Sequence, residues 1–393
     1  MELNNKYEKF EDMEFIDNEL MRGVLEYGFI TPSKIQNITI KKIYEKGDII
    51  AQSQSGTGKT GAFCIGALTR VTKENKFPQI IIIANTRELA TQIHTIISDI
   101  SKYMKIQNEL CIGGQTNDNK KITSQIIIGT PGKINYLMKN KMFLIKEIKL
   151  LIMDEGDVLL KDDFIEQINS IFIQLQNNTQ ICIYSATYSN QIINLATEIM
   201  KNPYKILIEN ENLSLDLIKQ YKIELYQEKY KYETLQDIYK EIIIGQCIIF
   251  VNSKERVEKL TKNLINDNYT VGKIHSDIDI KQRTDTLKDF RIGKIRILIS
   301  TDILSRGIDV QQIGIVINYD LPNNDTTYIH RIGRSGRYGK IGITINFVTD
   351  RDKEIINNIE KKYNTKIRDM PIMNEINQYL SGVNGYLNLD VNT

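Results

Sequence analysis

The sequence predicts an α/β protein with two tandem domains, each a parallel β-sheet flanked by helices. Three observations support this prediction. The chain has 393 residues, which is long enough for more than one domain of ordinary size. Short isoleucine-rich runs recur between polar stretches of helical length, a pattern typical of buried parallel strands that alternate with helices. These runs form two sets, separated by a polar stretch with little periodicity.

The two sets of strand-like runs divide near residues 209–220. The polar stretch Asn210–Asp216 follows Pro203, which we expect to close the last strand-like stretch of the first half. The first set is Ile80–Ala84, Gln125–Gly129, Leu150–Asp154 and Ile181–Tyr184, and the second is Gln246–Val251, Thr270–Ile274, Ile295–Ser300, Ile313–Tyr319 and Gly342–Val348. We therefore expect an N-terminal extension over 1–40, a first domain over 41–209, a linker over 210–220, a second domain over 221–373 and a tail over 374–393.

The composition excludes several classes of protein. Lysine and arginine together number 51 and aspartate and glutamate 49, so the formal net charge of +2 gives no global sign of a polyanionic partner. The four cysteines lie far apart and form no CxxC pair, which argues against a zinc ribbon and against a disulfide framework. We find neither a signal-peptide pattern nor an apolar run of about 18 residues, and we therefore expect a soluble intracellular protein.

A glycine-rich segment, Gln54–Thr60, has the sequence context of a phosphate-binding loop. It follows the apolar stretch Asp48–Ala51 and precedes the helix-like stretch Gly61–Arg70. Backbone N–H groups of such a loop point at phosphate oxygens, and the start of the next helix adds positive potential. We expect Lys59 to reach the β- and γ-phosphates and the Thr60 hydroxyl to bind Mg²⁺. The residues expected to cradle the nucleotide phosphates are Ser55, Gly56, Thr57, Gly58, Lys59 and Thr60.

Two carboxylates, Asp154 and Glu155, stand at the C-terminal end of the predicted strand Leu150–Asp154. Open α/β sheets bind their ligands at this end of the strands. We expect Asp154 to hold Mg²⁺, partly through water, and Glu155 to orient and deprotonate an attacking water. An Asp–Glu pair alone is a weak signal, but it is a strong one about 95 residues after a phosphate-binding loop.

Further segments follow in a fixed order along the chain. They are Asp154–Asp157 (Asp-Glu-Gly-Asp), Ser185–Thr187 (Ser-Ala-Thr) and His330–Arg337 (His-Arg-Ile-Gly-Arg-Ser-Gly-Arg). This ordered set resembles that of the DEAD-box RNA helicases of superfamily 2, and the resemblance runs from about Phe10 to about Val348. It implies tandem RecA-like domains, ATP and Mg²⁺ as cofactors, and RNA-stimulated ATP hydrolysis by an ATP-dependent RNA helicase.

Within that family, the chain is most similar to the helicases of translation initiation. The loop Ser53–Thr60 and the run Tyr319–Asn324 are both typical of this subgroup. The resemblance implies local unwinding of duplexes in mRNA 5′ leaders and sequence-independent binding of single-stranded and duplex RNA. It also implies an initiation-factor 4G-type scaffold as partner, a monomer outside complexes, and a cytoplasmic location.

The upstream segment Gly28–Gln36 resembles the Q motif of the family. A glutamine amide offers a donor and an acceptor together, which matches the N6/N7 edge of adenine. The resemblance implies that Gln36 selects ATP over GTP and that Phe29 packs on the base. Thr31 is implied to belong to the same nucleotide site.

The second half also carries residues implied to act on the nucleotide. Gly307 and Asp309 match a motif that faces the ribose or the phosphates, and Arg334 and Arg337 match paired arginines that face the γ-phosphate. Guanidinium groups suit this task because they neutralise charge spread over phosphoryl oxygens. The arginines and the loop Gln54–Thr60 lie in different predicted domains, so we expect the site to be complete only when the domains close.

Several turns after predicted strands resemble the RNA-contacting motifs of the family. They present hydroxyls, backbone N–H groups and cations, which suit phosphates and sugars better than base edges. The residues implied to contact RNA are Thr86, Arg87, Gly114, Thr130, Gly132, Arg283, Thr301 and Asp302. The residues implied to couple nucleotide state to closure are Asp157, Ser185, Thr187 and His330. Among these, Ser185 and Thr187 are implied to hydrogen-bond Asp157.

Four positions depart from the family pattern. Asn85 replaces a proline, Lys133 replaces an arginine, Gly156 replaces an alanine and Ile280 replaces a glutamine. The lysine keeps its charge but loses the planar fork, and the loss of the glutamine puts one RNA contact in doubt. None of the four removes a phosphate-binding, metal-binding or proton-transfer group, so we expect an active ATPase.

Two other functions use much of the same pattern. One is an ATP-locked RNA clamp of the exon-junction type, which implies a nuclear location and different protein partners. The other is a DNA-directed motor of superfamily 2, which the Gly28–Gln36 and Ser185–Thr187 segments argue against. Identifying the bound partners by pull-down distinguishes the RNA clamp from an initiation helicase. Comparing the stimulation of ATP hydrolysis by RNA and by DNA tests the DNA-directed motor. The sequence assigns no function to the tail.

Overall fold

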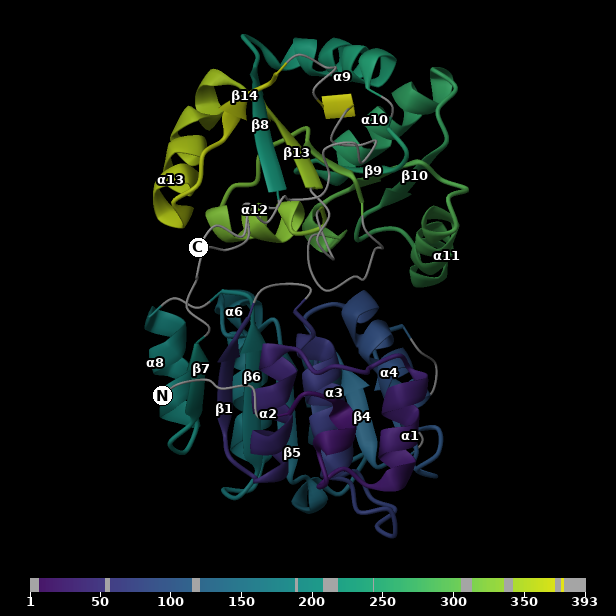
Figure 1. The fold of residues 1–393 in the computed structure, drawn as a ribbon, viewed down its shortest axis with the longest axis vertical. Helices are drawn as coiled ribbons and strands as arrows, with labels where there is room; N and C mark the ends of the chain where they lie inside the picture. Colours follow the sequence, from purple (N-terminus) through teal and green to yellow (C-terminus); the bar gives the residue numbers. More distant parts are fainter. Residues whose placement is uncertain are drawn as a thin grey trace. The chain divides into compact units, whose positions relative to one another are not determined.

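In the computed structural model, the described residues are 7–53, 57–114, 121–187, 190–207, 218–242, 244–304, 313–335, 342–371 and 376–377. The chain divides into two compact units, Met1–Glu209 and Asn210–Thr393 (Figure 1). Each unit contains one seven-stranded parallel sheet with helices around it. The predicted fold class, α/β with two tandem parallel sheets, is confirmed.

The first sheet has the strand order β3-β4-β2-β5-β6-β1-β7. Its strands are β1 (Ile49–Gln52), β2 (Ile80–Ile83), β3 (Asn108–Cys111), β4 (Ile126–Gly129), β5 (Leu150–Asp154), β6 (Gln180–Ser185) and β7 (Tyr204–Leu207). Its helices are α1 (Asn18–Glu26), α2 (Lys34–Tyr44), α3 (Lys59–Thr69), α4 (Arg87–Ser101), α5 (Pro131–Lys139), α6 (Gly156–Leu159), α7 (Asp162–Gln174) and α8 (Asn190–Ile199). Because all the strands are parallel, their carboxyl ends meet at one edge of the sheet.

Successive residues of each strand enter different cores, as the period of two requires. Ile80 and Ile82 of β2 belong to a core shared with α1, α2, α3 and α4. Ile81 and Ile83 belong to a second core shared with α5, α6, α7 and α8. Both faces of the sheet are therefore covered, and the strands have to be apolar along their whole length.

The N-terminal extension is built into the first unit. Gly23 of α1 lies so close to α4 that a Cβ added there would lie 1.8 Å from the carbonyl oxygen of Ile100. Phe10, which precedes α1, is completely buried in the same core. The described part of the extension, residues 7–40, therefore contributes to the hydrophobic core of this unit.

Two strands of the first sheet were not among the predicted runs. β3 pairs only with β4, and β7 pairs only with β1, so both lie at the sheet's edges. The prediction that Pro203 closes the last strand-like stretch was wrong, because β7 begins at the next residue, Tyr204. Edge strands contribute less surface to the core, which is why their residues are more polar and their pattern is weaker.

The second sheet has the order β10-β11-β9-β12-β13-β8-β14. Its strands are β8 (Ile218–Glu224), β9 (Cys247–Phe250), β10 (Val271–Ile274), β11 (Ile297–Ser300), β12 (Ile315–Asn318), β13 (Gly342–Val348) and β14 (Arg368–Asp369). Its longer helices are α9 (Lys231–Glu241), α10 (Lys254–Asn266), α11 (Ile280–Arg291), α12 (Asp325–Ile332) and α13 (Lys353–Tyr363). No helix in the described ranges is both long and apolar enough to cross a membrane.

The borders of the second unit carry more structure than the sequence predicts. β8 begins at Ile218, inside the stretch expected to be a linker, and pairs with β13 along its whole length. In the expected tail, Ile376 is fully buried in the core of this unit. The neighbouring Asn377 donates a hydrogen bond from its side chain to the carbonyl of Glu241 at 2.9 Å. At least these two tail residues pack with the second unit.

Candidate functional site

The glycine-rich loop leads from β1 into α3. Gly58 caps the helix with a φ of 95°, a left-handed conformation that glycine adopts without strain. The Nζ atom of Lys59 donates to the carbonyl of Ser53, and the hydroxyls of Ser53 and Thr57 lie 2.5 Å apart. The two ends of the loop are thus joined by side chains. Thr60, the expected Mg²⁺ ligand, is half-buried in the first turn of α3, whereas Ser55 and Gly56 lie outside the described residues.

The segment expected to bind adenine packs directly on this loop. Ser33 and Gln36 form a capping box at the start of α2: the Ser33 N–H donates to Oε1 of Gln36 at 2.8 Å, and the Gln36 N–H donates to the Ser33 hydroxyl at 3.4 Å. Nε2 of Gln36 donates to the carbonyl of Gly58 at 3.3 Å. The Gln36 amide therefore uses one donor and one acceptor in hydrogen bonds within the protein. One donor and one acceptor remain for a ligand.

Phe29 also reaches the first turn of α3. A Cβ added to Gly61 would lie 2.7 Å from the Phe29 ring and 2.9 Å from Nε2 of Gln36. The Phe29 ring lies between those of Tyr27 and Phe10, with centroids 5.1 and 5.8 Å away. Thr31, two residues further along the chain, is exposed. The structure therefore brings Phe29 and Gln36 together against the end of the phosphate loop.

The acidic pair stands at the end of β5. Burial, together with the charges of Glu155 and Asp157, raises the pKa of Asp154 to about 7, although the ammonium of Lys59 opposes the shift. Glu155 has a φ of 58° and a ψ of 48°, a left-handed conformation that is uncommon for residues other than glycine and is frequent at functional sites. Its N–H donates to Oδ1 of Asp154 at 3.0 Å. The two carboxylates thus leave the strand at a sharp turn.

Asp157 is held by the Ser-Ala-Thr segment after β6. Its two carboxylate oxygens accept from the hydroxyls of Ser185 at 2.5 Å and Thr187 at 3.0 Å. The Ser53 N–H donates to the carbonyl of Ser185 at 3.0 Å, which connects the same segment to the phosphate loop. The structure brings these residues together as the sequence predicts, while their role in coupling stays a prediction.

The residues expected to contact RNA in the first unit stand after β2, β3 and β4, which are neighbours in the sheet. Thr86 caps α4 and accepts from the Leu89 N–H at 3.2 Å. The Arg87 guanidinium lies against Gly113, because a Cβ added there would be 3.0 Å from it. Thr130 caps α5 without using its hydroxyl for the cap. Gly114 has a φ of 88°, and Gly132 lies in the first turn of α5. These groups share the carboxyl edge of the sheet with the acidic pair.

The second unit places its candidate residues after β11 and along α11 and α12. Thr301 and Asp302 follow β11, and Arg283 lies in the first turn of α11. His330 is on α12, and Nε of Arg334 donates to its carbonyl at 3.4 Å. The expected residues Gly307, Asp309 and Arg337 lie outside the described residues.

Sequence reasoning missed Arg331, which the fold buries completely. Its guanidinium donates to the Asp302 carboxylate at 2.6 Å, to the Asp320 carbonyl at 2.6 Å and to the Asn252 side chain at 2.8 Å. These three partners follow β11, β12 and β9, so Arg331 joins three strand ends to α12. The available signal was an arginine close to the apolar residues Tyr328, Ile329 and Ile332 of one helix. Asp302, expected to face RNA, holds Arg331 with one of its oxygens.

A second ionic cluster lies behind the same strand ends. Oδ1 of Asp320 accepts from Nζ of Lys231 at 2.9 Å and from Arg256 at 2.5 Å, and its other oxygen accepts from the Asn252 N–H at 3.1 Å. Glu228 pairs with both cations, and these pairs lower its pKa against the opposing effect of burial. The strand ends of the second unit are therefore fixed by charge-assisted hydrogen bonds.

Comparison with known proteins identifies the family. Residues 33–195 match the DEAD/DEAH box helicases, and residues 230–339 match the helicase conserved C-terminal domain. The ATP-dependent RNA helicase eIF4A of Saccharomyces cerevisiae strain YJM789 is 46% identical over 366 residues, which cover 92% of each chain. The Candida albicans protein of the same name is 45% identical over 372 residues, 94% of each chain. The structure of S. cerevisiae Dbp5 bound to RNA and ADP BeF3 matches with a TM-score of 0.90 at 33% identity, covering 95% of this chain and all of that one. The chain belongs to the DEAD-box family of ATP-dependent RNA helicases.

Proposed function

We propose that this DEAD-box helicase acts in translation initiation, where it opens short RNA duplexes locally at the expense of ATP. The observation that carries the proposal is the 46% identity to eIF4A, which extends over 92% of both chains and so includes both units. Such a function places the protein with cytoplasmic mRNA. It also requires RNA binding without sequence preference, since mRNA leaders share no common sequence.

The residues at the end of β5 and the start of α3 fit a magnesium–nucleotide complex. A buried carboxylate whose pKa is raised to about 7 is costly to ionise, and a divalent cation beside it would offset that cost. We propose that Asp154 and Thr60 hold Mg²⁺, which neutralises phosphate charge when it is bound. Lys59 then exchanges the Ser53 carbonyl for the β- and γ-phosphates, while Thr57 and Gly58 present backbone N–H groups. The same proposal includes Ser55 and Gly56.

Base selection and hydrolysis use different parts of the chain. The donor and acceptor that Gln36 retains would read the N6/N7 edge of adenine, with Phe29 packed on the ring. Glu155 takes the proton of the attacking water. Arg334 and Arg337 of the second unit stabilise charge on the γ-phosphoryl group, and Gly307 and Asp309 contact the ribose or phosphates.

RNA binding is proposed for the strand ends of both units. Hydroxyls and cations there suit a phosphate backbone, and the bonds from Ser185 and Thr187 to Asp157 connect the RNA side to the acidic pair. His330 is proposed to act in the same coupling. The proposed RNA ligands are Thr86, Arg87, Gly114, Thr130, Gly132, Arg283, Thr301 and Asp302.

The test is ATP hydrolysis measured with and without RNA, and then with an added initiation-factor 4G-type middle domain. We expect RNA to stimulate turnover, DNA to do so far less, and the scaffold domain to stimulate it further. Equal stimulation by DNA and RNA would contradict the RNA assignment. Capture of exon-junction proteins rather than a 4G-type scaffold would contradict the role in initiation and favour the clamp.

A further inference from the structure

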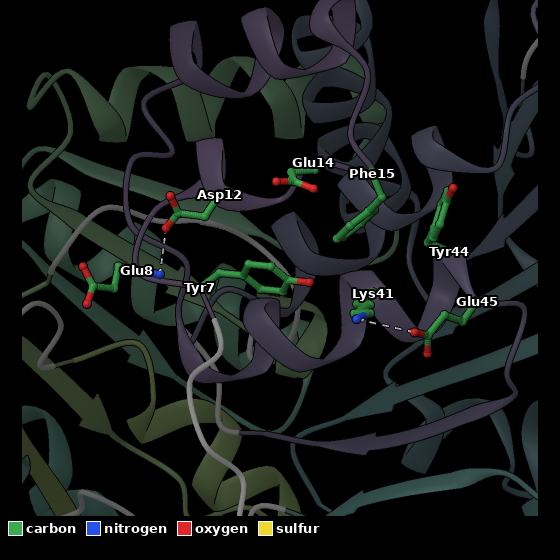
Figure 2. A pocket seen from close by; sticks show the side chains of 8 residues that line it. All are labelled: Tyr7, Glu8, Asp12, Glu14, Phe15, Lys41, Tyr44 and Glu45. Carbon is green, nitrogen blue, oxygen red and sulfur yellow. Dashed lines mark hydrogen bonds and ion pairs between the residues drawn. The ribbon is translucent and has the colours of Figure 1, made fainter.

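A pocket of about 670 Å³ lies on the first unit, between the segment before α1 and the last turn of α2 (Figure 2). Two segments of chain form it, one before α1 and one at the end of α2. Its lining is Tyr7, Glu8, Asp12, Glu14, Phe15, Lys41, Tyr44 and Glu45. None of these side chains belongs to the nucleotide or RNA groups described above, so the pocket needs a separate explanation.

Three aromatic rings follow one another along the pocket. The ring of Phe15 lies 6.2 Å from that of Tyr7 and 4.9 Å from that of Tyr44, measured between centroids. Figure 2 shows Phe15 between the other two rings. Tyr44 is 44% exposed, although a large aromatic side chain gains most from burial. Exposed aromatic faces carry negative potential and attract cations.

The charges around these rings are mainly negative. Four of the eight lining residues are acidic and one is basic, a formal excess of three negative charges. Glu45 pairs with Lys41 and Lys42, and Asp12 accepts from the backbone N–H groups of Glu8 and Lys9. Within the part of the chain that the structure describes, the carboxylates of Glu8 and Glu14 make no ion pair or hydrogen bond. RNA phosphates would be repelled here, whereas a cation would be attracted.

We propose that this pocket binds an arginine side chain from a basic segment of a partner protein. A guanidinium group is planar, so it can stack on Phe15 or Tyr44 while its N–H groups donate to the Glu14 carboxylate. An ammonium group offers no such plane and is more strongly hydrated. The combination of aromatic faces with the carboxylates of Glu8 and Glu14, which have no side-chain partner among the described residues, therefore favours arginine over lysine.

The pocket lies at the far end of α2 from the nucleotide site. Tyr44 follows Gln36 by eight residues, which is about 12 Å along a helix axis. The backbone of Tyr7 is fixed to this helix, since its N–H donates to Asn37 at 3.3 Å and its carbonyl accepts from Asn37 at 2.6 Å. An arginine in the pocket thus leaves Gln36 uncovered, and binding can be measured independently of ATP hydrolysis.

The experiment titrates the full chain by calorimetry with the peptide acetyl-Gly-Arg-Gly-Arg-Gly-amide. We expect a dissociation constant below about 1 mM, weaker binding of the matched lysine peptide, and no saturable binding of the citrulline peptide. Glu14→Gln and Tyr44→Ala should each weaken binding of the arginine peptide about tenfold. Glu11→Gln, an equal change of charge at an exposed residue three positions before Glu14 and outside the lining, should leave it unchanged.

Several outcomes would overturn the proposal. They are equal affinity in wild type, Glu14→Gln and Tyr44→Ala, an equal loss in Glu11→Gln, or equal binding of the citrulline peptide. A wild-type dimer, seen by light scattering and dispersed by the two pocket variants, would assign the pocket to a second copy instead. Unchanged melting temperature and RNA-stimulated hydrolysis in the variants show that they are folded, so a binding loss reports on the pocket alone.

Discussion

Two adjacent residues at the end of β5, Asp154 and Glu155, are assigned different chemical roles. Asp154 and Glu155 are adjacent, yet we assign metal binding to the first and proton transfer to the second. The left-handed backbone of Glu155 marks a sharp turn of the chain between the strand and α6, directly after Asp154.

Glu155→Gln should lower RNA-stimulated ATP turnover about 100-fold or more, since an amide cannot take a proton from water. Binding of ATP and RNA should persist, because the substitution keeps the size of the side chain and adds no charge. Fluorescent nucleotide and RNA titrations check the binding, and phosphate release checks turnover. Hydrolysis near the wild-type rate would remove Glu155 from the mechanism.

The raised pKa of Asp154 makes the stability of the protein depend on pH in a defined direction. In the folded state the carboxyl holds its proton up to about pH 7, whereas its ordinary pKa is 3.8. The folded state therefore binds more protons than the unfolded state across this window, and stability contributed by this group falls as the pH rises through it. Glu155 and Asp157 strengthen the effect, and Lys59 opposes it.

Asp154→Asn should therefore raise the melting temperature at pH 8 without Mg²⁺ and nucleotide, and the gain should shrink towards pH 5. Adding Mg²⁺ at pH 8 should stabilise the wild type and leave the variant almost unchanged. Thermal unfolding of both proteins at matched ionic strength measures this. A pH-independent difference between them would show that ionisation of Asp154 is not its cause.

At the scale of elements, two junctions hold the candidate site in place. In the first unit the start of α2 meets the start of α3 through Gln36 and Gly58. In the second unit Arg331 of α12 ties together the ends of β9, β11 and β12. Both junctions lie next to residues with a proposed role in binding nucleotide or RNA. Substitutions at either junction should therefore change stability and activity to different degrees.

Ser33→Ala and Gln36→Ala separate the structural and the proposed ligand roles of the first junction. Ser33→Ala removes the cap of α2 and should cost about 1 kcal/mol of stability with little change in the KM for ATP. Gln36→Ala removes the bond to Gly58 as well as the base contact, so the KM should rise about fivefold to tenfold. Preference for ATP over GTP should fall only in Gln36→Ala. Equal effects of the two substitutions on KM would contradict adenine reading by Gln36.

Arg331→Met should destabilise the second unit by about 3 kcal/mol, because it leaves four acceptors at the strand ends without this donor. Arg331→Lys should recover only part of this loss, since one ammonium cannot replace a planar fork that reaches four partners. Arg351→Met, at an exposed arginine of the same unit, provides the control. Denaturant unfolding followed by circular dichroism compares the three. A loss no larger than that of the control would contradict the structural role.

On the scale of the whole molecule, the chain consists of two units with separate sheets and separate cores. Each core is covered by helices of its own unit, so each unit is expected to fold alone. The proposed reaction nevertheless takes groups from both, because Lys59 and Glu155 lie in the first unit and Arg334 in the second.

Fragments 1–209 and 210–393 should therefore both be folded, as judged by circular dichroism and a cooperative melt. The first fragment should bind ATP but show no RNA-stimulated hydrolysis. Mixing the two should restore little activity, because the linker no longer holds them at a high effective concentration. RNA-stimulated turnover by fragment 1–209 alone would contradict the contribution of Arg334 and Arg337.

The sequence predicts the central strands well because both faces of each sheet are buried, and runs such as Ile80–Ile83 contain only apolar residues. It does not reveal β3 and β7, whose edge positions permit polar residues. The loop, acidic and Ser-Ala-Thr segments are local in sequence and were therefore predictable. The role of Arg331 was not, because its partners come together only when three strands align. The pocket beside α2 could not be predicted for the same reason. Its lining comes from two segments, before α1 and at the end of α2, that are far apart in the sequence.

The double use of Gln36 limits how this enzyme can evolve. Half of the amide's hydrogen-bonding capacity supports the helix start and the phosphate loop, and half is proposed to read the base. A substitution of Gln36 that changes the nucleotide preference also removes its hydrogen bonds to Ser33 and Gly58. The protein then loses stability unless other residues replace both bonds. A selection for GTP use is therefore expected to recover changes around position 36, at Ser33 or Gly61, before any change of Gln36 itself.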